Sequence, residues 1–236
     1  MAPPLVAITG LHKDYQGLRP LRMRALQLHA GDVVALAGLD ERAAEMLVGL
    51  LTGAALPDEG EVRLFDQATS SITETEAWLA LLDRIGLVTT RAVLIEPFTV
   101  RQNLALPFTI ALDPVPAEWI ARVDALAREA GIPEAQWDRP VGHADAETQA
   151  RVRVARALAL DPAVLLVEHP TATMPRDRVA DYGADLGRLA RARRLALLAI
   201  TADDVFARAL EGTRLTHQPV TGECQPAGFW SKILGR

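Results

Sequence analysis

The sequence predicts an α/β fold in which a largely parallel sheet is flanked by helices. Three compact apolar runs, at 32–37, 163–167 and 195–200, end at turn-forming or charged residues, which is typical of strands buried on both faces. Amphipathic helical patterns alternate with such runs, and strands that alternate with helices favour parallel pairing. With 236 residues, the chain is long enough for one large domain or two small ones.

The N-terminal part of the chain predicts strands over 5–9 and 21–28. The run at 32–37 ends at Gly38, the profile of a buried strand. A helix follows over 41–51, because apolar residues recur there at helical spacing until a Thr-Gly pair stops it.

Further elements follow a Pro-Asp-Glu-Gly turn at 57–60. Between about 91 and 158 the pattern is mostly helical and punctuated by prolines, so we expect a helical insertion there. The expected strands span 61–65, 85–89, 163–167 and 195–200, and the expected helices span 75–82, 118–130, 148–160, 178–192 and 203–210.

Composition excludes several classes of function. The 25 Lys and Arg against 30 Asp and Glu give a net charge of -5, so a basic surface for nucleic acid is not expected. The single cysteine, Cys224, excludes a disulfide framework and a cysteine-based zinc cluster. Asp161 and Pro162 interrupt the longest apolar stretch, and the N-terminus lacks the pattern of a signal peptide. We therefore expect a cytoplasmic protein.

Six segments in order along the chain carry a more specific pattern: GDVVALAG (31–38), PDEGEV (57–62), IGLVTT (85–90), FTVRQNLALPF (98–108), RVRVARALALDPAVLLVEHPTA (151–172) and LALLAITADD (195–204). Together they resemble the ATPase subunit of ATP-binding cassette (ABC) transporters. The resemblance implies one P-loop NTPase-like domain over 1–236, with an antiparallel β edge. Its implied parts are a RecA-like core (about 1–90 and 159–220), a helical subdomain (about 91–158) and a C-terminal tail (about 221–236).

The position of the phosphate-binding Walker A loop departs from the family pattern G-x-x-x-x-G-K-[ST]. Glycine amides, a lysine and a hydroxyl normally hold the phosphates and magnesium there. Only Gly38 is kept; Ala43 replaces the second glycine, Ala44 the lysine and Glu45 the hydroxyl residue, followed by Met46. Tyr15 takes the place of the adenine-stacking aromatic residue.

Acidic residues are expected to line this loop. Asp40, Glu41 and Glu45 would stand close together, with Arg42 offsetting part of their charge. Like charges about 4 Å apart cost on the order of 4 kcal/mol at an effective dielectric constant of 20, which equals the whole binding free energy of a millimolar ligand. We therefore expect no ATP or magnesium as cofactor unless the ancestral site still works. The other interpretation is a solvated helix start that the acids stabilise.

The remaining catalytic positions depart as well. Thr90 replaces the glutamine of the Q-loop, and Glu168 replaces the Walker B aspartate that holds magnesium. His169 stands in place of the glutamate that polarises water, and a histidine can accept a proton near neutral pH. Pro175 replaces the D-loop aspartate and Ala202 the switch histidine. We expect no catalytic residue among them, and His169 alone stays open as a base.

The signature loop LSGGQ aligns with Ala144, Asp145, Ala146, Glu147 and Thr148. In the family, this loop completes the ATP site of the facing subunit, so Asp145 and Glu147 would repel its γ-phosphate. The interpretation that we favour over this exclusion of ATP is that they cap a helix that begins at Thr148.

A second set of residues points to a partner. The resemblance places the groove for the membrane subunit beyond the Q-loop, at Ile95, Phe98, Val100, Leu104, Pro107 and Phe108. These side chains are either a docking surface or the core of the helical subdomain. NLALPF resembles the branch of the family that serves lipid, lipoprotein or cell-envelope trafficking. At the C-terminus, an apolar stripe could pack on the chain itself, a permease or a bilayer; it comprises Phe229, Trp230, Ile233 and Leu234.

The preferred interpretation is a catalytically degenerate ABC subunit, a pseudo-ATPase with a structural or regulatory role in a membrane transport complex. Its expected partners are a transmembrane permease and an active ABC paralogue, as a heterodimer, or a second copy of itself. It would lie on the inner face of the cell membrane. Two alternatives stay open: a divergent active ATPase that uses His169, and a binding module whose acidic cleft takes a cationic or metal ligand through Asp40, Glu41, Glu45 and Glu168.

Overall fold

The computed structural model describes residues 2–227, so the apolar C-terminal stripe that begins at Phe229 lies outside the described residues. The strands are β1 (Val6–Lys13), β2 (Leu21–Leu28), β3 (Val33–Ala37), β4 (Glu59–Leu64), β5 (Gln67–Ala68), β6 (Ile85–Val88), β7 (Val164–Glu168), β8 (Ala196–Ile200), β9 (Thr213–His217) and β10 (Cys224–Pro226). The helices are α1 (Glu41–Leu51), α2 (Thr75–Leu82), α3 (Val100–Ala105), α4 (Ala117–Glu129), α5 (Ala146–Ala157), α6 (Val179–Arg193) and α7 (Asp204–Ala209).

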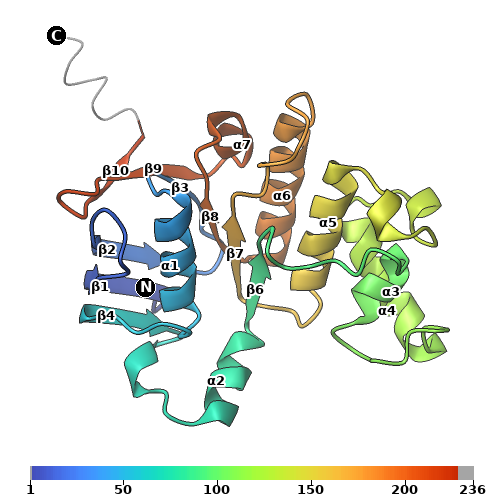
Figure 1. Ribbon diagram of the computed structural model, residues 1–236, viewed down its shortest axis with the longest axis horizontal. Helices are drawn as coiled ribbons and strands as arrows, with labels where there is room; N and C mark the ends of the chain where they lie inside the picture. The colour runs from blue at the N-terminus through green and yellow to red at the C-terminus, as the bar shows by residue number, and fades with distance from the viewer. Residues whose placement is uncertain (1, 228–236) are drawn as a thin grey trace.

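Two sheets organise these elements (Figure 1). The larger sheet has the order β10-β9-β3-β8-β7-β6, in which β9, β3, β8, β7 and β6 run parallel and β10 pairs with β9 antiparallel. The smaller sheet, of order β2-β1-β4-β5, is antiparallel. This confirms the predicted fold class, a largely parallel sheet flanked by helices with an antiparallel β edge.

The parallel strands are buried on both faces, as their apolar runs predict. In β7, Val164 and Leu166 pack into one hydrophobic cluster with α1 and the antiparallel sheet. Leu165 and Val167 point the other way, into a second cluster formed with helices α3 to α7. Side chains alternate along a strand, so each strand contributes to both clusters. Because β3, β6, β7 and β8 run parallel, the loops that follow them meet at the same edge of the sheet.

Several boundaries differ from those predicted. The first strand continues past Thr9 to Lys13, because Gly10 takes a positive φ of 60° and the pairing with β4 shifts register there. Helix α5 begins at Ala146, two residues before the predicted start at Thr148. Strands β9 and β10 were not predicted, because their sequences are short and mix polar with apolar residues.

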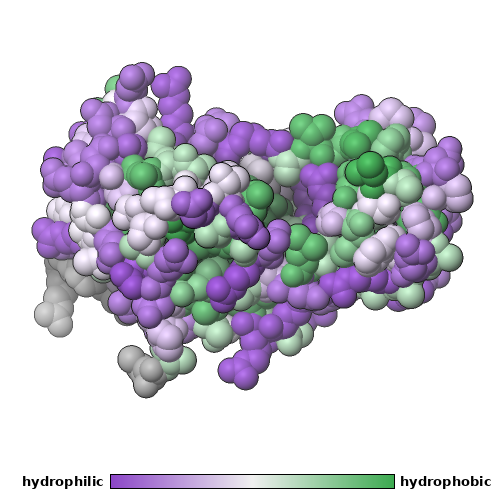
Figure 2. Space-filling model, turned by 90° about the horizontal axis from the view of Figure 1, so that it is seen from below, coloured by the Kyte–Doolittle hydropathy of each residue, from purple (hydrophilic) through white to green (hydrophobic). Residues whose placement is uncertain are grey.

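The surface is uneven in polarity. Seen from below, hydrophobic side chains gather over the half of the molecule that carries α3, α4 and α5 (Figure 2). Val93, before α3, and Ile110, after it, are among the most exposed apolar residues of the protein, at 75% and 97%. Within residues 2–227, every helix is too short or too polar to span a bilayer.

Candidate functional site

The carboxyl ends of the parallel strands surround a cavity of about 870 Å³. Open α/β sheets bind ligands at this edge, because the loops that leave neighbouring strands meet there. The cavity is lined by Leu39, Asp40, Glu41, Thr90, Arg91, Glu168, His169, Thr171, Ala172, Met174, Arg176, Thr201, Ala202, Asp203, Asp204 and Val205. It therefore brings together the predicted positions Thr90, Glu168, His169 and Ala202.

The loop between β3 and α1 is tight and already holds a carboxylate. Gly38 has a φ of 88°, and a Cβ there would lie 2.5 Å from the carbonyl oxygen of His217, so only glycine fits. Asp40 is the N-cap of α1: its Oδ1 accepts a hydrogen bond from the amide of Ala43 at 2.8 Å. Ala43 stands at the second glycine position of the family pattern, and its amide is therefore already hydrogen-bonded to the carboxylate of Asp40.

Arg91 pairs with both acidic residues that replace metal-binding positions. Its Nη1 and Nη2 donate to Glu168 Oε1 and Oε2 at 3.0 and 2.6 Å, and its Nη1 lies 3.6 Å from Glu45 Oε1. Sequence reasoning missed this residue and expected Arg42 to offset the acidic loop. Arg42 makes no ion pair within the described part of the chain. The one available signal was that Arg91 directly follows the Q-loop position Thr90.

His169 follows Glu168 in a left-handed backbone conformation with a φ of 41°. Its amide donates to the carbonyl of Ile200 at 2.9 Å, which fixes the loop after β7 against β8. The Nε2 atom of His169 is buried and makes no hydrogen bond to any described residue. His169 is one of the residues that line the cavity, although its Nε2 atom is itself buried.

Asp203 lies in the loop after β8 and holds together several residues that line the cavity. It caps α7 and accepts hydrogen bonds from Thr171 Oγ1 at 3.0 Å and Arg176 Nη1 at 2.5 Å. Burial opposes its ionisation, but the Phe206 amide, Arg176 and Thr171 all donate to the carboxylate and together hold the pKa of Asp203 below its usual value. Its neighbour Ala202, at the switch-histidine position, adds no polar side chain.

Tyr15 lies beside the phosphate-loop position, in a second cavity of about 330 Å³. This cavity also touches Gly38, Asp40 and Ala43, and Tyr15 packs against the cluster under the antiparallel sheet, so a stacking role for Tyr15 stays a prediction. Burial, then the nearby Asp40 charge, raises the pKa of Tyr15. Met46 is half-buried on α1 and packs against the cluster under the antiparallel sheet.

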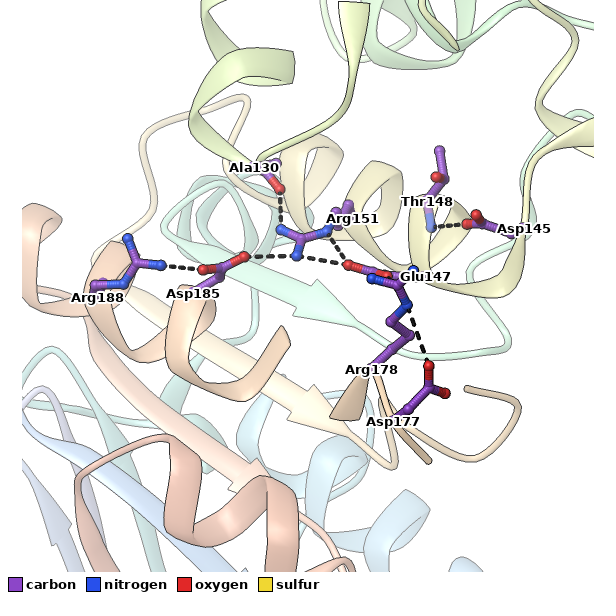
Figure 3. Close-up of polar contacts among 9 residues, drawn as sticks. All are labelled: Ala130, Asp145, Glu147, Thr148, Arg151, Asp177, Arg178, Asp185 and Arg188. Carbon is purple, nitrogen blue, oxygen red and sulfur yellow. Dashed lines mark hydrogen bonds and ion pairs between the residues drawn. The ribbon is translucent and has the colours of Figure 1, made fainter. Parts of the chain in front are cut away.

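The signature-equivalent residues hold α5 rather than reach outward (Figure 3). Asp145 is the N-cap of α5 and accepts from the amide of Thr148 at 2.7 Å, which is the capping role favoured from the sequence. Glu147 Oε1 accepts from Arg151 at 2.8 Å, and Arg151 also donates to Asp185 at 2.6 Å and to the carbonyl of Ala130 at 3.0 Å. The side chain of Glu147 is therefore held along α5.

The predicted docking residues divide into two groups. Val100 and Leu104 are buried in the core formed by α3, α4 and α5, so they do not face a partner, and their assignment to a docking surface is corrected. Phe108 is half-buried and stacks on Trp119 with ring centres 4.9 Å apart. Ile95 is exposed, and Phe98 and Pro107 are half-buried. Docking at this second group stays a prediction.

The donor set does not fit magnesium and a triphosphate. A guanidinium lies against Glu168 and Glu45, where a divalent cation would need free carboxylate or hydroxyl oxygen atoms. The lysine position is Ala44, which is fully buried. The same ion pairs occupy two of the four acids proposed for a cationic ligand. Within residues 2–227, no group of three His, Cys, Asp or Glu side chains is placed to hold a metal ion.

Comparisons with known proteins agree on one family. A family model described as "ABC transporter" matches residues 21–172. The chain is 32% identical over 200 residues to the phosphonates import ATP-binding protein PhnC of Anaeromyxobacter dehalogenans, covering 81% of this chain and 40% of that protein. It is 30% identical over 198 residues to the lipoprotein-releasing system ATP-binding protein LolD of Pseudomonas syringae pv. tomato, covering 81% and 86%.

Solved structures show the same fold. An ATP-binding cassette in a dimeric post-hydrolysis state, bound to ADP and Pi, superposes with a TM-score of 0.74 at 21% identity, covering 93% of this chain and 96% of that chain. The protein cbiO1 from Clostridium perfringens, part of the transporter complex cbiONQ, superposes with a TM-score of 0.78 at 19% identity, covering 100% and 92%. At these identities the likeness concerns the fold.

Proposed function

The chain belongs to the ABC transporter family, and from that premise we propose that it is a catalytically degenerate nucleotide-binding subunit, with a structural or regulatory role in a membrane transport complex. The observation that carries this proposal is the position of Arg91 between Glu45 and Glu168. A divalent cation at the same carboxylates would have to displace a guanidinium that already donates two hydrogen bonds to the buried Glu168.

The phosphate loop supports the same proposal. Triphosphate binding at a helix start depends on free backbone amides and on a cation. Here the carboxylate of Asp40 accepts from the Ala43 amide, Ala44 supplies no charge, and Asp40 and Glu41 both line the cavity. A phosphate oxygen entering the loop would therefore compete with a carboxylate for the amide and be repelled by its charge.

The names of the relatives suggest the setting in which the subunit acts. One is an import protein for phosphonates, and others belong to lipoprotein-releasing systems. Lipid or cell-envelope trafficking is the cargo class that fits the lipoprotein-releasing relatives, one of which this chain covers over 93% of its length. We expect a transmembrane permease as partner and a peripheral position on the inner face of the cell membrane.

The altered phosphate loop favours pairing with a different cassette. A dimer with an active ABC paralogue would retain one intact phosphate loop, whereas two copies of this chain would both carry Ala44 at the lysine position. An active ABC paralogue is therefore the expected partner, and a homodimer is the alternative.

The proposal is tested by calorimetric titration of the full chain with ATP and magnesium. We expect no binding tighter than a Kd of about 1 mM. A relative with an intact phosphate loop, titrated under the same conditions, is the positive control, and a cooperative thermal transition shows that the chain is folded. A Kd in the micromolar range would overturn the proposal.

A divergent active ATPase is the second candidate, and the free Nε2 of His169 favours it. This atom is buried at the cavity without a partner among residues 2–227 and stands where the family has its general base. If the chain hydrolyses ATP, phosphate release exceeds background and His169→Ala abolishes it. Phosphate release that is absent, or equal in the two proteins, excludes this candidate.

A further inference from the structure

Residues 91–98, here called the connector segment, join β6 to α3 and present Val93 and Ile95 at the surface. Ile95 and Phe98 of this segment belong to the predicted docking surface for the membrane subunit, and Val93 of the same segment is exposed. Its first residue, Arg91, also lines the cavity at the edge of the larger sheet. The connector segment therefore links the degenerate site physically to the expected docking surface.

Arg91 fastens one end of the connector segment to the core. Glu168 ends β7 and is buried, and Glu45 lies on α1, so one guanidinium joins β7, α1 and the end of β6. The two parallel hydrogen bonds to Glu168 fix the direction of the side chain as well as its distance. A metal ion shared between a loop and a core carboxylate would make the same kind of link.

Two other groups hold the rest of the connector segment. On α5, Arg153 Nε donates to the carbonyl of Ala92 at 3.3 Å, and Arg156 Nη1 donates to the carbonyl of Val93 at 2.9 Å. Burial lowers the pKa of both arginines, as expected for cations that lie partly inside the protein.

Asn103, which is fully buried on α3, holds the far end. Its Oδ1 accepts from the amide of Ile95 at 2.9 Å, and its Nδ2 donates to the carbonyls of Ile95 and Phe98 at 3.1 and 3.3 Å. Asn103, Arg153 and Arg156 thus bind the connector segment to the helical insert. Leu94 is buried in the core cluster that includes residues of the larger sheet. Among the polar side-chain contacts within residues 2–227, only those of Arg91 join the connector segment to β7 and α1.

We propose that Arg91 is a tethered cation that replaces a bound metal ion and fixes the connector segment in one conformation in the absence of nucleotide. The docking surface at Val93 and Ile95 is then assembled permanently, whatever the nucleotide concentration. The role of the connector segment in docking rests on the proposed function. The link that Arg91 makes between the segment and the core does not depend on that function.

Hydrogen exchange of the full chain, measured without nucleotide, tests the tether. The double variant Arg91→Gln, Glu168→Gln removes the ion pair without leaving a buried charge, so the fold survives. We expect the amides of Ala92 and Ile95 to exchange about tenfold faster than in the unmodified chain, because the segment loses its link to the sheet. The matched control is Arg42→Gln, which removes an arginine beside the same loop and leaves exchange unchanged.

Two further arms separate the tether from general loosening. Arg91→Lys keeps the positive charge but cannot donate two parallel hydrogen bonds to Glu168. The rate of hydrogen exchange at 91–98 should therefore rise by less than in the double variant. Addition of ATP and magnesium leaves exchange of the unmodified chain unchanged. Equal exchange in the double variant and the unmodified chain, or slower exchange of 91–98 on adding ATP and magnesium, would overturn the inference. Because the variants are compared without nucleotide, their result does not depend on whether the chain binds ATP.

Discussion

Two ion clusters in this protein each place one arginine between two acids, but they bury different members of the cluster. In the cleft, Arg91 lies between Glu45 and Glu168; under the signature-equivalent loop, Arg151 lies between Glu147 and Asp185. The arginine of the cleft is 43% exposed while Glu168 is only 4% exposed. Arg151 is 9% exposed, and its acids are 20% and 34% exposed.

This difference decides what each arginine does for the fold. An acid that cannot reach water depends on its partner, whereas an acid with access to water can be solvated when the partner is removed. In the cluster around Arg91, the buried carboxylate of Glu168 therefore needs the arginine as its partner. In the cluster around Arg151, the buried group is the arginine, and its two acids can be solvated without it. Substitutions in the two clusters should separate these dependencies.

The largest effect is expected for Arg91→Ala. It leaves the carboxylate of Glu168 buried and unpaired, which costs about 3 kcal/mol of unfolding free energy, at the lower end for broken buried pairs because Arg91 is itself partly exposed. Chemical denaturation measures it. Adding Glu168→Gln should recover most of the loss, and a double variant as unstable as Arg91→Ala would show that the buried charge is not the cause.

A smaller loss is expected for Arg151→Met, about 2 kcal/mol in the same measurement. Methionine fills most of the volume, and Glu147 and Asp185 turn toward water, but the carbonyl of Ala130 loses a donor. Arg188 also contacts Asp185, so that acid keeps a cation. A cost larger than that of Arg91→Ala would contradict the comparison of burial.

The two helix caps beside these clusters should be equivalent. Asp40 and Asp145 each accept one hydrogen bond from the amide three residues later, at 2.8 and 2.7 Å. Asp40→Ala and Asp145→Ala should each cost about 1 kcal/mol of unfolding free energy, and the asparagine variants, which keep the acceptor, should cost much less. If Asp40→Ala were neutral while Asp145→Ala was costly, repulsion among the cleft acids would outweigh the cap.

These residues also show what the sequence could predict. The strands β3, β7 and β8 were predicted because each is a continuous apolar run, which indicates burial on both faces of the sheet. The capping role of Asp145 was available from local sequence, because a cap depends on residues three positions apart. The pairing of Arg91 was not, because Glu45 and Glu168 are distant along the chain and meet Arg91 only once the sheet has formed.

The prediction of a docking surface was wrong for Val100 and Leu104 for a related reason. Val100 and Leu104 lie among apolar residues, and from sequence alone the inward and outward sides of a short helix look the same. The structure separates them, because Leu104 packs in the core with α4 and α5 while Val93 and Ile95 remain exposed. Tertiary packing, rather than local pattern, decides which apolar residues reach the surface.

The smallest effect is expected in the acid range, from Asp203. Because its pKa in the folded state is below the usual value of 3.8, ionised Asp203 contributes stability at pH values above its unfolded pKa. That contribution is lost as the pH falls through the lower folded pKa. Asp203→Asn keeps acceptors for the Val205 and Phe206 amides but cannot ionise. Its unfolding free energy should therefore fall less steeply with decreasing pH below 4 than that of the unmodified chain, as measured by denaturation at several pH values; parallel curves would contradict the ionised cap.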